Sequence, residues 1–210
     1  MVEQEHEYAL IGGVNRAKIG RYLSILAATV SAAIVFMLLA AIDLAHRLGI
    51  PANLPPAVLS LVGAGAVFII LYWLFDQYVW RWSYLTRLLK VPDLSGDWSC
   101  KGQTLNPNGT PSFVWDATIT IIQSWDKIRV RLKTKQSGSN SIAAALIWDS
   151  ADGYRLLYNY RNDPKIGEVE LKSHLGFAAL TFAKDCESAE GEYFNGHGRF
   201  TFGTMHLVRF

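Results

Sequence analysis

The chain has 210 residues, half of them hydrophobic, and 20 Lys and Arg against 18 Asp and Glu give it a formal net charge of +2. Residues 93–210 carry 13 basic and 13 acidic residues, so the excess of positive charge lies in the first 92 residues. Long nucleic acids bind to basic faces, because contact with many phosphates releases counterions. The balanced charge of residues 93–210 therefore argues against a long nucleic acid as partner and leaves room for a small anionic ligand.

Two apolar stretches without charged residues, at 23–42 and 57–75, dominate the first part of the chain. About twenty helical residues span the ~30 Å hydrocarbon core of a bilayer, where a helix satisfies its own backbone hydrogen bonds. The first stretch is too long for the core of a cleavable signal peptide, and a second one follows it. We therefore expect a hairpin of two transmembrane helices within residues 22–75, with a short loop between them that contains prolines.

Basic residues gather on one side of this predicted hairpin, which sets its orientation. They are Arg16, Lys18 and Arg21 before the first helix, and Arg81, Arg87 and Lys90 after the second. The positive-inside tendency then places both termini in the cytoplasm of a multi-pass protein of the bacterial inner membrane, with residues 1–21 as an N-terminal cytoplasmic segment. Neither span carries an acidic residue, a basic residue or a proline, which pumps and channels use at membrane depth. The hairpin is thus predicted to be an anchor.

Residues 76–92 are expected to form a juxtamembrane stem that is helical until Pro92. Residues 93–210 then alternate between apolar and polar residues, as half-buried strands do, and Asn, Asp, Gly and Pro separate the alternating segments. One such separating turn is expected at 137–140. About eight strands are expected, near 94–104, 112–124, 127–136, 141–149, 154–162, 168–183 (one strand or two), 190–195 and 199–209. The short connections favour an all-β, antiparallel, lipocalin-like meander that closes into a β-barrel; a flattened sandwich is the alternative.

The sequence gives little support for catalysis or metal binding. Three histidines of the β-rich part, His174, His197 and His206, are scattered, and no serine or cysteine lies in a nucleophile-elbow motif. Cys100 and Cys186 have neither metal-ligand nor disulfide-framework spacing, so we expect buried free thiols. The chain is therefore predicted to be a protein without enzymatic activity, cofactor or metal.

The best candidates for ligand contact are polar and aromatic residues on two strand faces. Tyr158 and Tyr160 share one face of the fifth expected strand, whereas Arg199, Thr201 and Arg209 share one face of the last. If these faces point inward, the rings can stack on bases, and the guanidinium and hydroxyl groups can bind phosphate oxygens. The alternative is that the tyrosines fill the barrel while the arginines reach solvent from its ends.

The order of parts and several short motifs resemble a known bacterial family. The motifs are Leu94-Ser95-Gly96-Asp97-Trp98, Gln123-Ser124-Trp125, the serines at 137, 139 and 141, Leu156 with Tyr158 and Tyr160, His174-x-Gly176-x-Ala178, Gly191-x-Tyr193 and Arg199-x-Thr201-x-Gly203. With two predicted spans before them, they make residues 16–210 similar to the SMODS-associating two-transmembrane, β-strand-rich effectors of bacterial CBASS anti-phage systems. The β-barrel of that family is regarded as a minimal STING-like sensor.

The resemblance implies that the barrel binds a cyclic dinucleotide made by a partner nucleotidyltransferase during phage infection. It also implies that the bound copies form a homo-oligomer and that their clustered spans disrupt the inner membrane, which causes abortive infection. Two other functions stay open: a membrane-tethered barrel that carries a lipid or other apolar ligand, and a passive scaffold with a filled barrel that binds only protein. Converging Arg, Thr and Tyr side chains in the lumen would favour the nucleotide, and aliphatic walls would favour the lipid.

Overall fold

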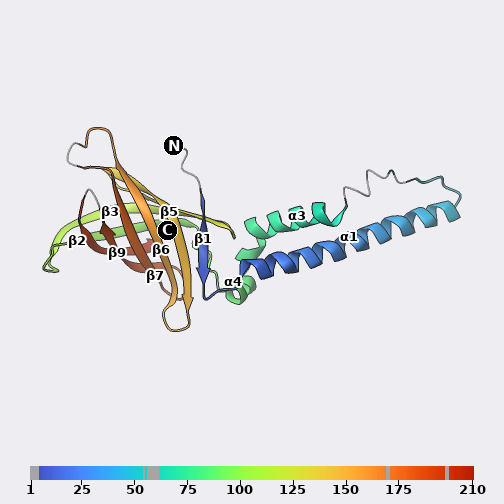
Figure 1. The fold of residues 1–210 in the computed structure, drawn as a ribbon, viewed down its shortest axis with the longest axis horizontal. Coiled ribbons are helices and arrows are strands. Elements are labelled where there is room, and N and C mark those ends of the chain that lie inside the picture. Colours follow the sequence, from blue (N-terminus) through green and yellow to red (C-terminus); the bar gives the residue numbers. More distant parts are fainter. Residues whose placement is uncertain (1–4, 54, 56–61, 169–170, 197–198) are drawn as a thin grey trace. The chain divides into compact units, whose positions relative to one another are not determined.

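A computed structural model of the chain describes residues 5–53, 55, 62–168, 171–196 and 199–210. It divides into two compact units, one made of residues 14–80 and the other of residues 1–13 together with 81–210. The first unit is helical, and the second is built mainly of strands (Figure 1). Each unit is described here by itself.

The helical unit contains α1 (Arg16–Arg47) and α3 (Ala64–Gln77). The side chain of Asn15 starts α1, because its Oδ1 accepts a hydrogen bond from the Ala17 N–H at 2.8 Å. Within the described residues, only α1, with 32 residues, is long and apolar enough to cross a bilayer. It contains the first predicted span, at 23–42.

The second predicted span, at 57–75, is found only in part. Residues 57–61 lie outside the described part of the chain, and α3 has 14 residues, too few to span a bilayer alone. The described residues therefore contain one helix of spanning length rather than the expected hairpin of two. Within this unit α3 lies beside α1 (Figure 1), and Ser31 Oγ on α1 donates a hydrogen bond to the Val62 carbonyl at 2.5 Å.

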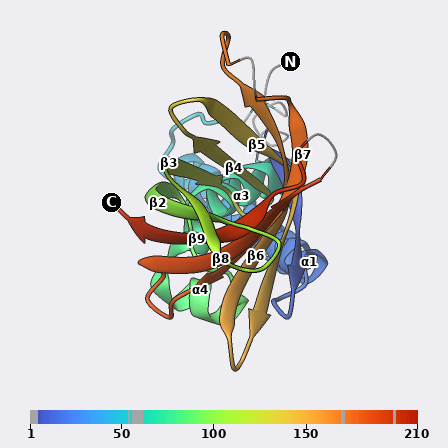
Figure 2. The same cartoon turned by 90° about the vertical axis from the view of Figure 1, so that its left-hand side faces the viewer.

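The predicted stem is helical in two short pieces, the 3-10 helix η1 (Val79–Arg81) and α4 (Ser83–Leu89). The strands are β1 (His6–Ile11), β2 (Gly96–Leu105), β3 (Pro111–Gln123), β4 (Lys127–Lys133), β5 (Ser137–Asp149), β6 (Gly153–Pro164), β7 (His174–Phe182), β8 (Ser188–Asn195) and β9 (Phe202–Arg209). They are hydrogen-bonded in the closed order β1-β4-β3-β2-β9-β8-β7-β6-β5 (Figure 2). From β2 to β9 each strand pairs antiparallel with the next, and β9 pairs with β2, so the predicted meander is confirmed for these eight strands.

The prediction of a turn at 137–140 is wrong, because these residues begin β5. The chain instead turns at Lys135 and Gln136, where the Thr134 N–H donates to the Ser137 carbonyl at 2.9 Å. Ser137 and Ser139 are both buried, with Gly138 between them. A composition typical of turns thus concealed an alternating pattern that points two hydroxyl side chains into the barrel.

Strand β1 was not predicted, and it completes the ring. β4 and β5 pair with each other only at one end, where Arg131–Lys133 lie beside Gly138–Asn140. At the other end β1 lies between them, antiparallel to β4 at His6 and Glu7 and parallel to β5 from Tyr8 to Ile11. The ring is therefore not purely antiparallel. Six residues without an adjacent hairpin partner give too short a pattern for a strand to be recognised.

The buried side chain of Gln123, at the end of β3, joins β1 to the segment before β2. Gln123 is 2% exposed, and its Oε1 accepts a hydrogen bond from the Leu94 N–H at 2.9 Å. Its Nε2 donates to the Pro92 carbonyl at 3.2 Å and to the Tyr8 hydroxyl at 3.3 Å. The carboxamide thus has partners on two segments, and this fixes β1 in the wall of the barrel.

The interior of the barrel changes character along its axis. Near Gln123 the inward side chains are large, apolar and fully buried, among them Trp98, Leu156, Leu180 and Leu207. This end supplies most of the buried apolar area that stabilises the barrel. Toward the other end the inward positions carry Tyr, Ser, Thr and Asn, and the interior is hollow there.

Replacement of Gln123 by Ala should destabilise the barrel by about 2–4 kcal/mol, because the Leu94 N–H and the Pro92 carbonyl lose their partner in a buried site. The measurement is thermal or denaturant unfolding of the full chain in detergent. Gln136→Ala is the matched control, since Gln136 is exposed and bonds only at the surface. Equal stability of the two variants would contradict the role given to Gln123.

Candidate functional site

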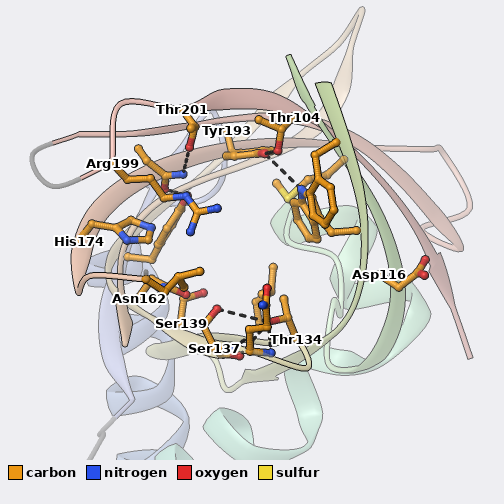
Figure 3. Close-up of a pocket in the computed structure, with 18 of the residues that line it drawn as sticks. Thr104, Asp116, Thr134, Ser137, Ser139, Asn162, His174, Tyr193, Arg199 and Thr201 are labelled. Carbon is orange, nitrogen blue, oxygen red and sulfur yellow. Dashed lines mark hydrogen bonds between the residues drawn. The ribbon is translucent and has the colours of Figure 1, made fainter. Parts of the chain in front are cut away.

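A cavity of about 500 Å³ lies in the barrel, at the end away from Gln123. Its walls are mainly inward positions of β2 to β9, together with the turn between β4 and β5 and the segments before β7 and β9 (Figure 3). β1 contributes no lining residue, although its two neighbours β4 and β5 both do. The cavity therefore occupies the part of the barrel where β4 and β5 pair directly.

Aromatic rings form one part of the lining. Tyr158 and Tyr160 project from alternate positions of β6, with their ring centroids 6.0 Å apart. Trp115 on β3 meets Tyr193 on β8 edge to face, with 5.6 Å between centroids. Such rings offer flat faces on which a planar ligand group can stack.

Two glycines make room for these rings. Gly176 on β7 lies opposite Tyr160, and a Cβ atom there would come within 2.4 Å of the Tyr160 ring. Gly102 on β2 lies opposite Trp115 in the same way, and a Cβ atom would come within 2.1 Å of the indole. Each ring can therefore lie across the neighbouring strand instead of standing away from it.

A hydrogen-bonded chain of three side chains crosses from β6 to the end of β8 and the segment before β9. The Tyr160 hydroxyl donates to Asn195 Oδ1 at 2.9 Å, and Asn195 Nδ2 donates to Thr201 Oγ1 at 2.8 Å. Burial raises the pKa of Tyr160 above its ordinary value, Tyr193 adds to this shift, and Arg199 opposes it. The phenol is therefore neutral at physiological pH and acts as a donor within this wall.

The opposite wall is made of hydroxyl and amide groups around the turn from β4 to β5. Thr134 Oγ1 accepts a hydrogen bond from the Ser137 N–H at 2.9 Å and lies 3.3 Å from Ser137 Oγ. Ser139 and Asn162 are buried beside them and also line the cavity. This wall presents several small groups that can donate or accept hydrogen bonds.

Positive charge reaches the cavity from its open end. Arg199 and Lys135 both line it, and both are exposed. Figure 3 shows the Arg199 side chain directed into the cavity near His174 and Thr201, whereas Asp116 points away. The arrangement suits a small anion with flat groups: cations at the mouth, rings along the walls, and hydroxyl and amide groups between them.

Four of the five predicted contact residues line this one cavity. Tyr158, Tyr160 and Thr201 do so from the walls, and Arg199 does so from the segment before β9 rather than from a strand. Arg209 does not line it. Its guanidinium lies at the far end of β9, 5.2 Å from the Trp98 ring, and donates to the Ser95 carbonyl. The alternation along the last strand was predicted correctly, but the strand is longer than the cavity is deep.

Several lining residues were not predicted as contacts, among them Thr104, Trp115, Asn162, Tyr193 and Asn195. The spacing of serines 137 and 139 by two residues is the signal in the sequence that could have identified one wall. No local sequence pattern indicates the hydrogen bond between the Tyr193 hydroxyl and Thr104 Oγ1, at 2.8 Å, because these residues meet only in the closed ring.

Both cysteines are free, as predicted, although only Cys100 is fully buried. Burial, with a smaller contribution from Asp116, raises the pKa of the Cys100 thiol to about 12, so that it stays protonated at physiological pH. Among the described residues no group of three or more His, Cys, Asp or Glu side chains is placed to hold a metal ion.

A helix of spanning length joined to a barrel with a ring-lined cavity is the arrangement expected of a membrane-associated receptor for a small ligand. Comparison with known proteins makes this more specific. Residues 89–209 match the model of the Cap15 cyclic dinucleotide receptor domain, and residues 17–81 match that of the Cap15 TM helices. The chain is also 46% identical over 206 residues to CD-NTase-associated protein 15 of Yersinia aleksiciae. This alignment covers 98% of each of the two chains. The chain belongs to the Cap15 family, which confirms the resemblance to CBASS effectors.

Replacement of Gly176 by Ala should force the Tyr160 ring out of its position and destabilise the chain by about 1–3 kcal/mol, because the added methyl overlaps the ring. Thermal unfolding of the full chain in detergent measures the effect. Gly138→Ala is the matched control on β5, where the nearest atom to an added Cβ is 3.6 Å away. If both variants unfold at the same temperature, Gly176 does not provide the space for Tyr160.

Proposed function

We propose that the barrel cavity binds a cyclic dinucleotide made by a partner nucleotidyltransferase. The composition of the lining is the observation that carries this proposal. Tyr158, Tyr160 and Trp115 can stack on the two bases, and the buried hydroxyl and amide groups can bond to base edges and ribose. Arg199 and Lys135 can pair with the two phosphates. The family's receptor domain matches the same residues, 89–209.

The size and polarity of the cavity favour this ligand over the alternatives. A volume of about 500 Å³ falls within the ~300–1,000 Å³ usual for small-molecule sites. A lipid carrier needs mainly aliphatic walls, whereas Ser, Thr, Asn, Tyr and Arg side chains line this cavity together with the apolar Phe113, Val114, Leu132, Leu171 and Met205. A passive scaffold with a filled lumen is disfavoured by the same volume.

The connectivity of the barrel supports a two-span anchor in the bacterial inner membrane. β1 precedes the helical unit and β2 to β9 follow it, yet all nine strands share one barrel. A single crossing would place β1 and the other strands on opposite sides of the membrane. We therefore propose an even number of crossings: α1 makes one and the segment that ends in α3 makes the other, which the match to the family's TM helices at 17–81 supports. The basic residues before α1 and after α3 support the proposal that both termini lie in the cytoplasm.

In this proposal the ligand-bound chains gather into a homo-oligomer in the plane of the membrane. Molecules confined to a plane meet at a high effective concentration, so a modest contact is enough to assemble them. The clustered helices then disrupt the inner membrane and stop the infected cell, which is the abortive infection expected of a CBASS effector. The chain itself acts as a receptor and effector and not as an enzyme.

Replacement of Arg199 by Ala should weaken binding of a cyclic dinucleotide about ten- to hundredfold, because a charge-assisted hydrogen bond to phosphate contributes ~1.5–3 kcal/mol. Calorimetric titration of the full chain in detergent, with a panel of cyclic dinucleotides that contains both 3′,5′ and 2′,5′ linkages, measures this. Lys133→Ala is the control, since Lys133 is exposed on β4 and does not line the cavity. Equal affinities of the two variants would remove Arg199 from the site, and no binding by the unaltered chain would refute the proposed ligand.

The orientation of the anchor is tested separately by cysteine labelling on intact cells. A reagent that cannot cross the inner membrane should label Asn53→Cys, in the loop between the helices, because two crossings place that loop outside. It should not label Phe210→Cys at the exposed C-terminus. Labelling of Phe210→Cys without labelling of Asn53→Cys would contradict the proposed topology, because it would show the opposite orientation.

A further inference from the structure

Three neighbouring strands each place one polar side chain at the same level of the cavity wall. Ser139 on β5 is the cross-strand partner of Asn162 on β6, and Asn162 is the partner of His174 on β7. Each of the three is 6% exposed and lines the cavity. Figure 3 shows them in order along one side of it. Because paired strands lie ~4.8 Å apart, these side chains form a row about 10 Å long, which we call the polar row.

The next row, one step further into the barrel, satisfies its own polar groups. It carries Ser141, Tyr160 and Asn195 on β5, β6 and β8. The Tyr160 hydroxyl donates to Asn195 Oδ1 at 2.9 Å. Ser141 Oγ accepts a hydrogen bond from the Val130 N–H at 2.9 Å and lies 2.7 Å from His6 Nε2. The groups of this second row hold the wall together and are therefore already occupied.

The polar row differs from its neighbour in that its functional atoms are free. Within the described part of the chain, Ser139 Oγ, the Asn162 carboxamide and His174 Nε2 form no hydrogen bond. None of them is among the buried atoms that lack both a partner and access to open space. They therefore reach the cavity that their residues line. Buried polar groups in native proteins are rarely left unpaired, so free groups gathered at one level of a cavity indicate contacts that a bound ligand completes.

His174 has a fixed role in this row. Its Nδ1 lies 2.8 Å from the Lys172 carbonyl, which can only accept, so Nδ1 carries the hydrogen. In the neutral ring Nε2 then has no hydrogen and can only accept. Hydroxyl and carboxamide groups both donate and accept, so Ser139 and Asn162 adapt to either kind of ligand atom. Among the three side chains, His174 alone requires one kind of partner.

From these observations we infer that the polar row reads the bound cyclic dinucleotide, and that His174 Nε2 selects a ligand with a hydrogen-bond donor at that point. A cyclic dinucleotide offers such a donor as the N–H of a base amino group or the O–H of a free ribose hydroxyl. Arg199 lies near His174 (Figure 3) and, as a permanent cation, suits a phosphate better than the ring does. The inference deepens the proposed function and rests on it, since it names the residues that set which cyclic dinucleotide is bound.

The test compares a parent ligand with two analogues by calorimetry at about pH 8, where histidine side chains are ordinarily neutral. The parent is the cyclic dinucleotide of the panel that the unaltered full chain binds most tightly in detergent. One analogue has a carbonyl oxygen or a hydrogen atom in place of every base amino group, as inosine does, and the other lacks the free ribose hydroxyls. The analogue without the required donor should bind about tenfold more weakly or worse, because it leaves the acceptor unpaired. The analogue that loses affinity identifies the donor.

Replacement of His174 by Asn separates this selection from a structural role. The Asn Nδ2–H can still donate to the Lys172 carbonyl, but no atom takes the place of Nε2. The variant should bind the parent about tenfold more weakly and the weaker analogue to within about twofold of the parent, with an unfolding temperature close to that of the unaltered chain. His174→Phe, which keeps a ring without its nitrogens, should lose the discrimination as well. His206→Asn is the matched control: His206 is exposed on β9 and does not line the cavity, so affinity and discrimination should both persist.

Two results would overturn the inference and leave the proposed ligand intact. One is equal affinity of the unaltered chain for the parent and both analogues, since no donor is then selected. The other is discrimination that persists in His174→Asn, since the acceptor is then another atom. If the unaltered chain binds no member of the panel, the proposed function itself is refuted, and the inference fails with it.

Discussion

The carboxamide of Gln123 holds the N-terminal strand in the barrel wall, and the rest of the architecture depends on that attachment. β4 and β5 diverge at the end of the barrel near this residue, so the wall is complete only when β1 lies between them. The Tyr8 hydroxyl reaches Gln123 from β1, while Pro92 and Leu94 reach it from the segment that enters β2. One buried side chain thus joins β1, which precedes the helical unit in the sequence, to the segment before β2, which follows it.

The barrel separates stability from recognition along its axis. Around Trp98, Leu156 and Leu207 the interior is closely filled, and burial of apolar area there supports the fold. At the other end rings and hydroxyl groups surround a space instead of filling it, and Gly102 and Gly176 keep the rings against the wall. A cavity of this kind is tolerable because the filled end provides the stability that the hollow end does not. The residues that line this cavity all lie within 89–209, the part of the chain that matches the Cap15 cyclic dinucleotide receptor domain.

The sequence alone predicted what local pattern determines. The uncharged run at 23–42 predicted a spanning helix, and alternation predicted β2 to β9 as well as the face that Tyr158 and Tyr160 share. It missed what depends on ring closure: β1 has no adjacent hairpin partner, and Ser137 was assigned to a turn by composition. Arg209 was grouped with Arg199 by periodicity, which gives the face of a residue but not its depth along the barrel axis.

The strand that closes the barrel also makes the receptor a split domain. The match to the receptor domain begins at residue 89, about eighty residues after β1 ends in the sequence. A truncated fragment that starts there would leave edges of β4 and β5 unpaired, and bare edges of this kind invite aggregation. A soluble receptor suitable for crystallisation or drug screening must therefore regain residues 6–11, either as an added peptide or by circular permutation that links them to the fragment.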